Sequence, residues 1–160
     1  MTEPLLHVVL VEPEIPPNAG NIARLCAATR CRLHLVGPLG FEVSDRYLKR
    51  AGLDYWEFLD WKVWENWEAF RAENGFPERW HLFTTKGERR HVDASFRAGD
   101  YLLFGRESKG LPEALLNAHP DRRVRIPKLH PQVRSLNLST AAGIGVYEAL
   151  RQLEFGTPGA

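Results

Sequence analysis

Long apolar runs are missing from this sequence of 160 residues. No stretch approaches the ~20 consecutive apolar residues that a membrane-spanning helix requires. The first residues, Met1 to Pro4, also lack the basic start and apolar stretch of a secretion signal. We therefore expect a cytoplasmic protein with no membrane partner. With 44% apolar residues, residues 1–160 are expected to form a single globular domain with its own core.

Cysteine is also scarce. Cys26 and Cys31 are too few for a disulfide framework, and we expect both to be reduced and structural. The six histidines show no paired ligand spacing, and the cysteines do not form a CxxC unit. The sequence therefore predicts no metal site. It also lacks a GxSxG setting for a nucleophilic serine.

Overall charge is low, but it is distributed unevenly along the chain. The net charge is +1, which by itself gives no sign of a nucleic-acid partner. Residues 54–78 carry seven acidic and two basic side chains, whereas residues 79–134 carry twelve basic and six acidic ones. Such asymmetry can create one face that attracts a polyanion, or it can be ordinary surface scatter. Composition leaves both alternatives open.

The amino-terminal pattern is typical of a parallel α/β protein. The apolar run His7–Val11 predicts a buried strand, and the proline-rich residues 12–18 predict an irregular loop. Apolar positions from Ala19 onward recur at helical spacing, with Asn18 as the expected cap. Leu33–Val36 then predicts the second strand. Strand, helix and strand in this order indicate a parallel sheet flanked by helices.

The middle of the chain is richer in aromatic residues. We expect helices over residues 45–51 and 66–73, with a short strand within residues 55–64. The tryptophans of this region could stack on RNA bases. Their acidic neighbours would repel phosphate, which favours a role in the core or in an interface.

The second half of the chain repeats a strand followed by a polar turn. Strands are expected at His81–Thr85, Tyr101–Phe104 and Val124–Ile126, and each is followed by a turn that contains glycine or proline. Ligands bind outside the carboxyl ends of the strands in open parallel sheets. If the three strands are neighbours, their turns form one composite pocket.

Two glycine patterns do not match known phosphate-binding motifs. Gly105 and Gly110 have the spacing of a P-loop, but Leu111 and Pro112 follow instead of lysine and serine or threonine. Walker-type nucleotide binding is therefore excluded. The pair Gly143 and Gly145 lies inside a predicted helix rather than in a strand-to-helix turn, so we interpret it as a packing feature.

The segment Ile126–Gln152 passes from an irregular loop into a helix. Asn137 or Ser139 could simply cap this helix by accepting hydrogen bonds from its first N–H groups. The same amino end could instead help to hold a ligand, because it carries unpaired N–H groups and partial positive charge.

Three ordered segments resemble the motifs of the SPOUT-class RNA 2′-O-ribose methyltransferases. They are PEIPPNAGNIARLC at 13–26, FGRESKGLP at 104–112, and the pair IP at 126–127 with RSLNLS at 134–139. Within this class the chain is most similar to the small single-domain TrmL group, which methylates the tRNA wobble nucleotide. The likeness extends from His7 to Leu153 and includes RAGLDY at 50–55 and TTKG at 84–87.

This resemblance implies a fold, a cofactor and an assembly. The implied fold is a mostly parallel sheet whose carboxyl-terminal part, approximately residues 80–153, is tied in a trefoil knot. The implied assembly is a homodimer that acts on tRNA. The implied cofactor is S-adenosylmethionine, with S-adenosylhomocysteine as product and no metal. By matched position the cofactor would lie against Phe83, Thr84, Gly105, Glu107, Gly110, Ile126, Ser135 and Leu138.

The resemblance also assigns catalytic positions. Arg24 matches the catalytic arginine, but a guanidinium is not deprotonated in proteins, so we do not expect it to be the base. We expect it to hold an RNA phosphate or to stabilise the developing alkoxide, while a phosphate oxygen or a water takes the proton. A polar lining would orient it, formed by Asn18, Glu107, Ser135 and Asn137. The alternative for each of these is ordinary capping and turn chemistry.

Basic side chains supply candidate RNA contacts. Phosphate contacts position RNA without specifying its sequence. The candidates are Arg24, Lys86, Arg89, Arg90, Lys109, Arg122, Arg123 and Lys128. Arg106 stands where close relatives often have proline, which leaves two alternatives open for it, a contact with RNA or no contact. Two other functions remain open, namely methylation of a different tRNA or rRNA ribose, and RNA binding without catalysis.

Overall fold

The computed structural model describes residues 3–43 and 53–156. The helix expected at residues 45–51 lies outside this part of the chain. The described strands are β1 His7–Val11, β2 Arg32–Val36, β3 Asp60–Trp64, β4 Trp80–Phe83, β5 Arg89–Arg90, β6 Tyr101–Phe104 and β7 Arg123–Arg125. The α-helices are α1 Pro16–Thr29, α3 Trp67–Asn74, α4 Glu113–Ala118 and α5 Leu138–Gln152. Short 3₁₀ turns are η1 Leu53–Phe58, η2 Pro77–Arg79, η3 His91–Asp93, η4 Pro120–Arg122 and η5 Glu154–Gly156.

All seven strands form one parallel sheet in the order β3-β2-β1-β6-β4-β7-β5. The expected parallel α/β architecture is therefore confirmed. The strands β6, β4 and β7 are neighbours, which was the condition for a composite pocket. Within the described ranges, no helix is long and apolar enough to cross a membrane.

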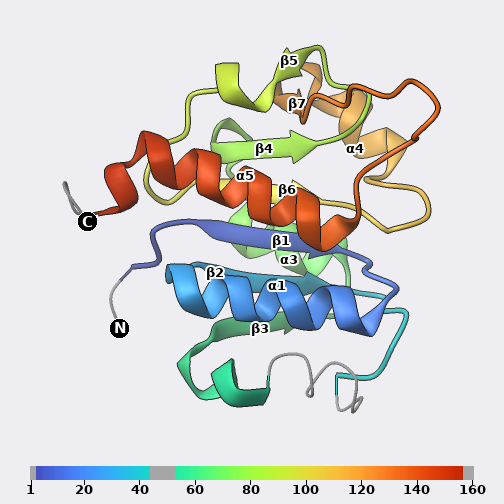
Figure 1. Ribbon diagram of the computed structural model, residues 1–160. Coiled ribbons are helices and arrows are strands. Elements are labelled where there is room, and N and C mark those ends of the chain that lie inside the picture. The colour runs from blue at the N-terminus through green and yellow to red at the C-terminus, as the bar shows by residue number, and fades with distance from the viewer. Residues whose placement is uncertain (1–2, 44–52, 157–160) are drawn as a thin grey trace.

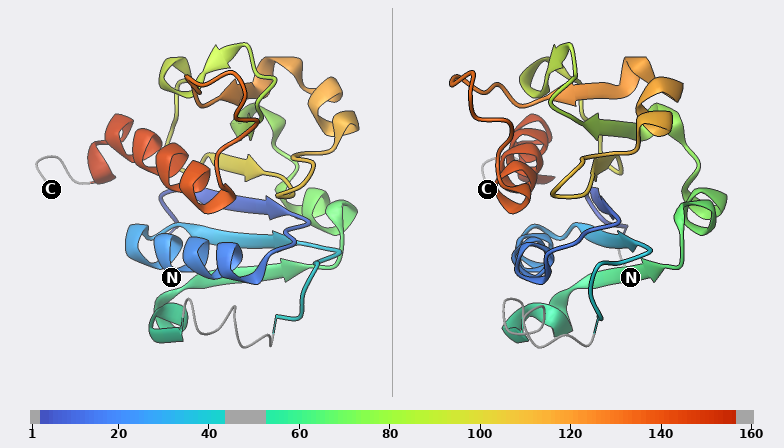
Figure 2. Two further views of the ribbon diagram at one scale, coloured as in Figure 1. Left: turned by 45° about the vertical axis from the view of Figure 1, so that its right-hand side comes forward. Right: turned by 90° about the vertical axis from the view of Figure 1, so that its right-hand side faces the viewer.

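The sheet has a separate hydrophobic core on each face. Along β1, Val8 and Leu10 belong to the core that α1 and α5 complete, whereas Val9 and Val11 belong to the core beneath α3 and α4. This alternation follows from the two-residue period of a strand. Figure 1 and Figure 2 show α1 and α5 side by side on one face and α3 on the other. Because both faces are covered, the central strands are apolar throughout.

Helix α1 begins earlier than the sequence pattern predicts. Pro16 and Pro17 occupy its first two positions, and the capping position is Ile15 rather than Asn18. The first N–H groups of a helix have no partner within it, so proline loses nothing there and its fixed φ suits the helix. The prediction that residues 12–18 are wholly irregular, with Asn18 as cap, was therefore wrong.

Other boundaries shift by one or two residues. Strand β4 begins at Trp80 and ends at Phe83, and β7 covers Arg123–Arg125 rather than 124–126. Helix α3 agrees closely with its prediction, since Asn66 accepts a hydrogen bond from the Ala69 N–H at 2.9 Å and caps the helix. Helix α5 starts directly after Asn137, as expected.

The two glycines of α5 have different surroundings. A Cβ atom on Gly145 would lie 2.9 Å from the ring of Phe83 and 3.3 Å from the ring of Phe104. Gly145 therefore allows α5 to approach the sheet closely, as the packing interpretation predicts. A Cβ atom on Gly143 would meet nothing within 4 Å in the described chain. Close packing within this chain therefore explains Gly145 but does not explain Gly143.

Two tryptophans belong to the core rather than to an exposed stacking surface. Trp64 is buried, and Trp56 and Trp61 are half-buried and pack against the core, in agreement with the favoured interpretation; Trp80 on β4 is buried as well. The Trp64 indole N–H donates to Nδ1 of His34 at 3.0 Å, and Nε2 of His34 lies 2.9 Å from Nδ1 of His7. An indole can only donate, so the proton of neutral His34 is on Nε2, which donates to His7. Burial is the main cause that lowers the pKa of His7 to about 4 and of His34 to about 3.

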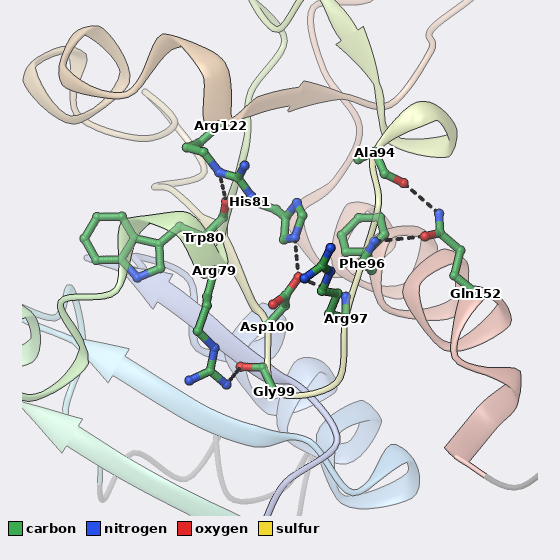
Figure 3. Close-up of polar contacts among 10 residues, drawn as sticks. All are labelled: Arg79, Trp80, His81, Ala94, Phe96, Arg97, Gly99, Asp100, Arg122 and Gln152. Carbon is green, nitrogen blue, oxygen red and sulfur yellow. Dashed lines mark hydrogen bonds and ion pairs between the residues drawn. The ribbon is translucent and has the colours of Figure 1, made fainter.

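A second polar cluster lies at the amino ends of β4 and β6 (Figure 3). Nε2 of His81 and Oδ2 of Asp100 are 2.8 Å apart and almost fully buried. The Arg97 backbone N–H donates to the same carboxylate at 3.0 Å. Gln152 of α5 accepts from the Phe96 N–H and donates to the Ala94 carbonyl. These contacts fix the connection between β5 and β6 against α5, at the end of the strands opposite the turns that follow them.

Candidate functional site

The turns that follow β4, β6 and β7 enclose a cavity of about 930 Å³. It lies at the carboxyl ends of three adjacent strands, which is the usual ligand position in an open parallel sheet. In Figure 1 the carboxyl ends of these strands point to the right, where the long connection from β7 to α5 also lies. The composite pocket expected from the sequence is therefore present.

All eight residues that the resemblance assigned to the cofactor line this cavity. Phe83 and Thr84 come from the end of β4, and Ile126 follows β7. Apolar side chains and a few polar groups together are typical of small-molecule sites. The remaining members of the set are Gly105, Glu107, Gly110, Ser135 and Leu138.

The turn after β6 can form only with glycine at Gly105. A Cβ atom there would overlap the backbone of Gly110 and Leu111. Arg106 and Gly110 exchange two backbone hydrogen bonds, 3.1 Å from the Arg106 N–H and 2.8 Å from the Gly110 N–H. Gly110 has a φ of 70°, which favours glycine. The chain therefore folds back on itself and presents residues 106–109 as a rigid turn.

Glu107 joins this turn to the amino end of α1. Its Oε1 accepts from the Glu14 N–H at 2.9 Å, and its Oε2 accepts from the Ile15 N–H at 2.7 Å. The Asn18 amide also donates to Oε2, at 3.3 Å. A carboxylate at a helix amino end is stabilised by the free N–H groups and by the partial positive charge. Glu107 therefore performs the capping that the sequence pattern assigned to Asn18.

Asn137 extends the network to a third loop. Its Nδ2 donates to Oδ1 of Asn18 at 3.2 Å. Its Oδ1 accepts from the backbone N–H groups of Ser139 and Thr140, so it also caps α5. Asn137 therefore both caps α5 and joins the hydrogen-bond network of the site. Ser135 lines the cavity but, among the described residues, its side chain makes no hydrogen bond.

Arg24 does not belong to the lining of this cavity. It is exposed on α1, and its guanidinium lies 4.8 Å from the centre of the Tyr55 ring. Six residues along a helix turn the side-chain direction by about 600°, so Arg24 and Asn18 point to different sides of α1. The structure brings together Asn18, Glu107 and Asn137, with Ser135 nearby, but it leaves Arg24 outside.

The predicted phosphate-binding residues separate into two groups. Lys86, Lys109 and Lys128 are exposed and line the cavity. The predicted arginines lie outside the cavity, and three of them have partners. Arg90 pairs with Asp93 at 2.8 Å, Arg122 donates to the Trp80 carbonyl at 2.8 Å, and Arg123 donates to the Pro120 carbonyl at 3.3 Å. Arg89 is exposed on β5.

Several residues of the site were not selected from the sequence. Glu14 accepts from the Ser108 N–H at 3.0 Å and from its hydroxyl at 2.7 Å, and these hydrogen bonds lower the pKa of Glu14. Arg106, Arg125 and Arg134 also line the cavity. Glu14, Arg106 and Arg134 lie within the matched motifs, which was an available signal, whereas Arg125 ends β7 outside them.

Comparisons with known proteins identify the family. The family model described as the SpoU rRNA Methylase family matches residues 5–147. This match spans most of the sequence, and the chain therefore belongs to the SpoU methylase family.

A protein of Aeromonas hydrophila named tRNA (cytidine(34)-2'-O)-methyltransferase is 54% identical over 152 residues, covering 94% of this chain and 96% of that protein. A solved structure described as giving insights into the 2-OH methylation of C/U34 on tRNA has a TM-score of 0.87 and 49% identity, covering 95% of this chain and 98% of that one. A Sinorhizobium meliloti rRNA methyltransferase with AdoMet bound has a TM-score of 0.82 and 26% identity, covering 95% of this chain and 58% of that one.

The cavity fits S-adenosylmethionine by its chemistry. Phe83, Ile126 and Leu138 provide apolar surface suited to an adenine ring. Arg106 lines the cavity and forms no ion pair with the described residues, so its guanidinium can offer positive charge to a ligand. Among the residues that the structure describes, no group of three or more His, Cys, Asp or Glu side chains could hold a metal ion.

Proposed function

We propose that this protein transfers a methyl group from S-adenosylmethionine to the ribose 2′-hydroxyl of the tRNA wobble nucleotide, cytidine or uridine 34. The observation that carries this proposal is the cavity at the ends of β4, β6 and β7, held by the Glu107–Asn18–Asn137 network. Relatives of nearly the same length, about half identical in sequence, are named for this reaction, which supports the choice of nucleotide.

The chain's residues divide the work of binding and alignment. Phe83, Ile126 and Leu138 would hold the adenine, and the rigid turn around Gly105 would lie against the rest of the cofactor. When bound, S-adenosylmethionine supplies the electrophilic methyl group. Methyl transfer needs the oxygen, carbon and sulfur in line, so the fixed loops contribute by alignment. Glu107 and Asn137 act by holding the loops, since their hydrogen bonds are made to protein atoms.

Arg24 remains the proposed catalytic arginine, as a cation that holds an RNA phosphate or stabilises the alkoxide. A phosphate oxygen or a water takes the proton, because arginine stays charged. Arg24 lies outside the cavity of its own chain, so this role requires an assembly in which a second copy faces the cavity. The proposed homodimer supplies such an assembly.

The apolar side chains of Leu129, Val133 and Leu136, exposed on the β7–α5 connection, suit a protein contact.

The proposal includes the finer features that the resemblance implies. Residues 1–160 form one domain, and the part from about residue 80 to residue 153 is knotted. The protein works in the cytoplasm, where tRNA is available. Exposed Lys109 and Lys128 at the cavity contact phosphates of the substrate, and Lys86 does so once it leaves its pair with Glu113. The partners of Arg90, Arg122 and Arg123 give those residues a structural role first.

Incubation with labelled S-adenosylmethionine and bulk tRNA, followed by nuclease digestion, tests the function. We expect one labelled 2′-O-methyl nucleotide at position 34. A label elsewhere in tRNA or in rRNA would keep the reaction and change the substrate. No label in any RNA, together with intact RNA binding, would support a non-catalytic RNA-binding protein. Arg24→Ala should abolish most turnover, and normal tRNA binding with near-normal turnover in this variant would contradict its proposed role.

A further inference from the structure

Arg106 brings an unpaired positive charge to the cavity. The residue is half-buried, lines the cavity, and its Nε atom is buried without a hydrogen-bond partner. Among residues 3–43 and 53–156 its guanidinium forms no ion pair. Arginine stays charged at physiological pH, and a partly desolvated charge without a partner is unfavourable. The cavity therefore contains a cation that a ligand can neutralise.

No nearby carboxylate of the described residues forms an ion pair with Arg106. Both oxygens of Glu107 accept hydrogen bonds from the start of α1. Oε1 of Glu14 accepts two hydrogen bonds from Ser108. Arg106 is close enough to contribute to the lowered pKa of Glu14, after the hydrogen bonds from Ser108, but the two side chains form no ion pair. The protein thus leaves the guanidinium to an outside anion.

The backbone that carries this charge is fixed before any ligand arrives. The backbone of Arg106 is hydrogen-bonded in both directions to Gly110, and the neighbouring Gly105 has no room for a side chain. The rigid turn removes the backbone part of the conformational freedom that binding would otherwise cost. Its planar fork matches a carboxylate, which can accept two parallel hydrogen bonds.

Burial indicates which anion is involved. Lys109 and Lys128 are exposed at the cavity and are placed to meet an RNA backbone outside, whereas the exposed Lys86 is paired with Glu113. Arg106 is less exposed, and its Nε is inaccessible to solvent. We propose that Arg106 binds the carboxylate of the methionine part of S-adenosylmethionine. This inference rests on the proposed cofactor and assigns a residue to the charged end of that molecule.

Binding of two ligands to two proteins tests the assignment without relying on turnover. S-adenosylhomocysteine and its analogue lacking the carboxylate are titrated by calorimetry into the full-length protein and into Arg106→Gln. We expect Arg106→Gln to weaken S-adenosylhomocysteine about 10- to 100-fold, the range for a lost charge-assisted pair. The decarboxylated analogue should bind both proteins equally. Arg106→Lys should recover part of the affinity, and Arg71→Gln on the remote helix α3 is the control for charge alone.

The possible results distinguish a wrong assignment of Arg106 from a wrong proposed function. Equal weakening of both ligands by Arg106→Gln, or weakening of neither, would overturn the carboxylate assignment. Unchanged cofactor binding with weaker tRNA binding would also overturn it and make Arg106 a phosphate contact. Unfolding midpoints of the variants, measured in parallel, separate these results from a damaged fold. If the unmodified protein binds no S-adenosylhomocysteine and methylates no tRNA, the proposed function itself fails.

Discussion

His7 and His34 lie next to each other on β1 and β2, where the sheet is covered on both faces. The hydrogen bond from Trp64 fixes the neutral tautomer of His34, and His34 in turn donates to His7. A proton added to Nδ1 of His34 would face the indole N–H of Trp64, so that two donors would meet. Both histidines therefore fold in the neutral form, in line with their lowered pKa values.

Acid should destabilise the protein through these two residues. Their pKa values are about 4 and about 3 in the folded state, against 6.5 for the free side chain. The unfolded chain binds more protons below pH 6.5, so stability is greatest above that pH and falls as the pH drops toward 4. We expect a loss on the order of 3 kcal/mol between pH 7 and pH 5, measured by urea unfolding.

The exposed His130 provides the control for this pH dependence, because His130→Gln should leave it unchanged. An unfolding free energy that is flat between pH 7 and pH 5 would contradict the assignment.

Tyr55 should position Arg24. The guanidinium lies 4.8 Å from the centre of the tyrosine ring, and such a contact contributes about 0.5–1 kcal/mol at an exposed site. Tyr55→Leu should therefore lower kcat for tRNA methylation about two- to five-fold, with the KM for the cofactor unchanged. Tyr55→Phe keeps the ring face and should behave like the unmodified protein. Equal kcat values for the Leu and Phe variants would show that the ring has no part in placing Arg24.

Helix α5 connects the packing of the core to the cavity. Gly145 lets the helix approach Phe83, and the Phe83 ring is stacked on Phe104 with 4.6 Å between ring centres. Phe83 and Phe104 also line the cavity. A side chain added at Gly145 would therefore press on the Phe83 ring and, through it, disturb the cofactor site.

The two glycines of α5 offer a matched pair of substitutions. Gly143→Ala enters open space and removes a helix-interior glycine, so it should raise the free energy of unfolding by up to ~1 kcal/mol. Gly145→Ala gains the same helix propensity but overpacks Phe83, which typically costs about 1–3 kcal/mol. We expect a less stable protein with weaker cofactor binding. Urea unfolding and calorimetry would measure both effects.

The Gly143 result also bears on assembly. A Gly143→Ala protein that loses both stability and its dimeric state would place this glycine in the subunit interface. Equal stability changes in the two variants would contradict the different packing assigned to them.

Local sequence predicted most elements but not the start of α1. Strands such as His7–Val11 and Tyr101–Phe104 were predictable because buried parallel strands read as apolar runs. The α1 boundary was not, because its capping carboxylate comes from Glu107, some ninety positions later. No local pattern contains that information. The cavity itself was predictable because strand order brings the turns after β4, β6 and β7 together.

The similarity of motifs could not show which way each side chain points, whereas helical geometry does. The likeness grouped Arg24 with Asn18, although six residues of helix turn them to different sides of α1. Likewise, the basic side chains of Arg122 and Arg123 were candidates by charge alone, but both donate to nearby carbonyl oxygens. Charge counts cannot reveal which cations already have partners.

At the scale of the whole molecule, strand order converts the uneven charge of the sequence into a difference between the sheet's two edges. The acid-rich residues 54–78 form η1 and β3 at one edge and α3 on one face. The base-rich residues 79–134 form β4, β5, β6, α4 and β7 toward the other edge, as Figure 1 shows from bottom to top. An approaching polyanion is therefore attracted to the half of the sheet that holds the cavity.

This asymmetry predicts the salt dependence of tRNA binding. Lys128→Gln, at the cavity, should weaken tRNA binding and reduce the slope of log K against log salt by about 0.7–0.9. Lys62→Gln is the matched control, because Lys62 is exposed on β3 at the acidic edge and lies over the Trp64 ring. Its slope should equal that of the unmodified protein. Filter binding from 50 to 200 mM salt gives the slopes, and identical slopes for all three proteins would refute the assignment.

The long reach of the site network has a consequence for synthesis on the ribosome. Asn18 is hydrogen-bonded to a residue 119 positions later, and the caps of α1 come from a residue more than ninety positions later. A nascent chain that has not yet reached Asn137 has no third wall for the cavity and no bridge to Asn18. Such a chain cannot hold the cofactor, however well its first strands have formed. Premature termination therefore yields inert fragments rather than partly active ones.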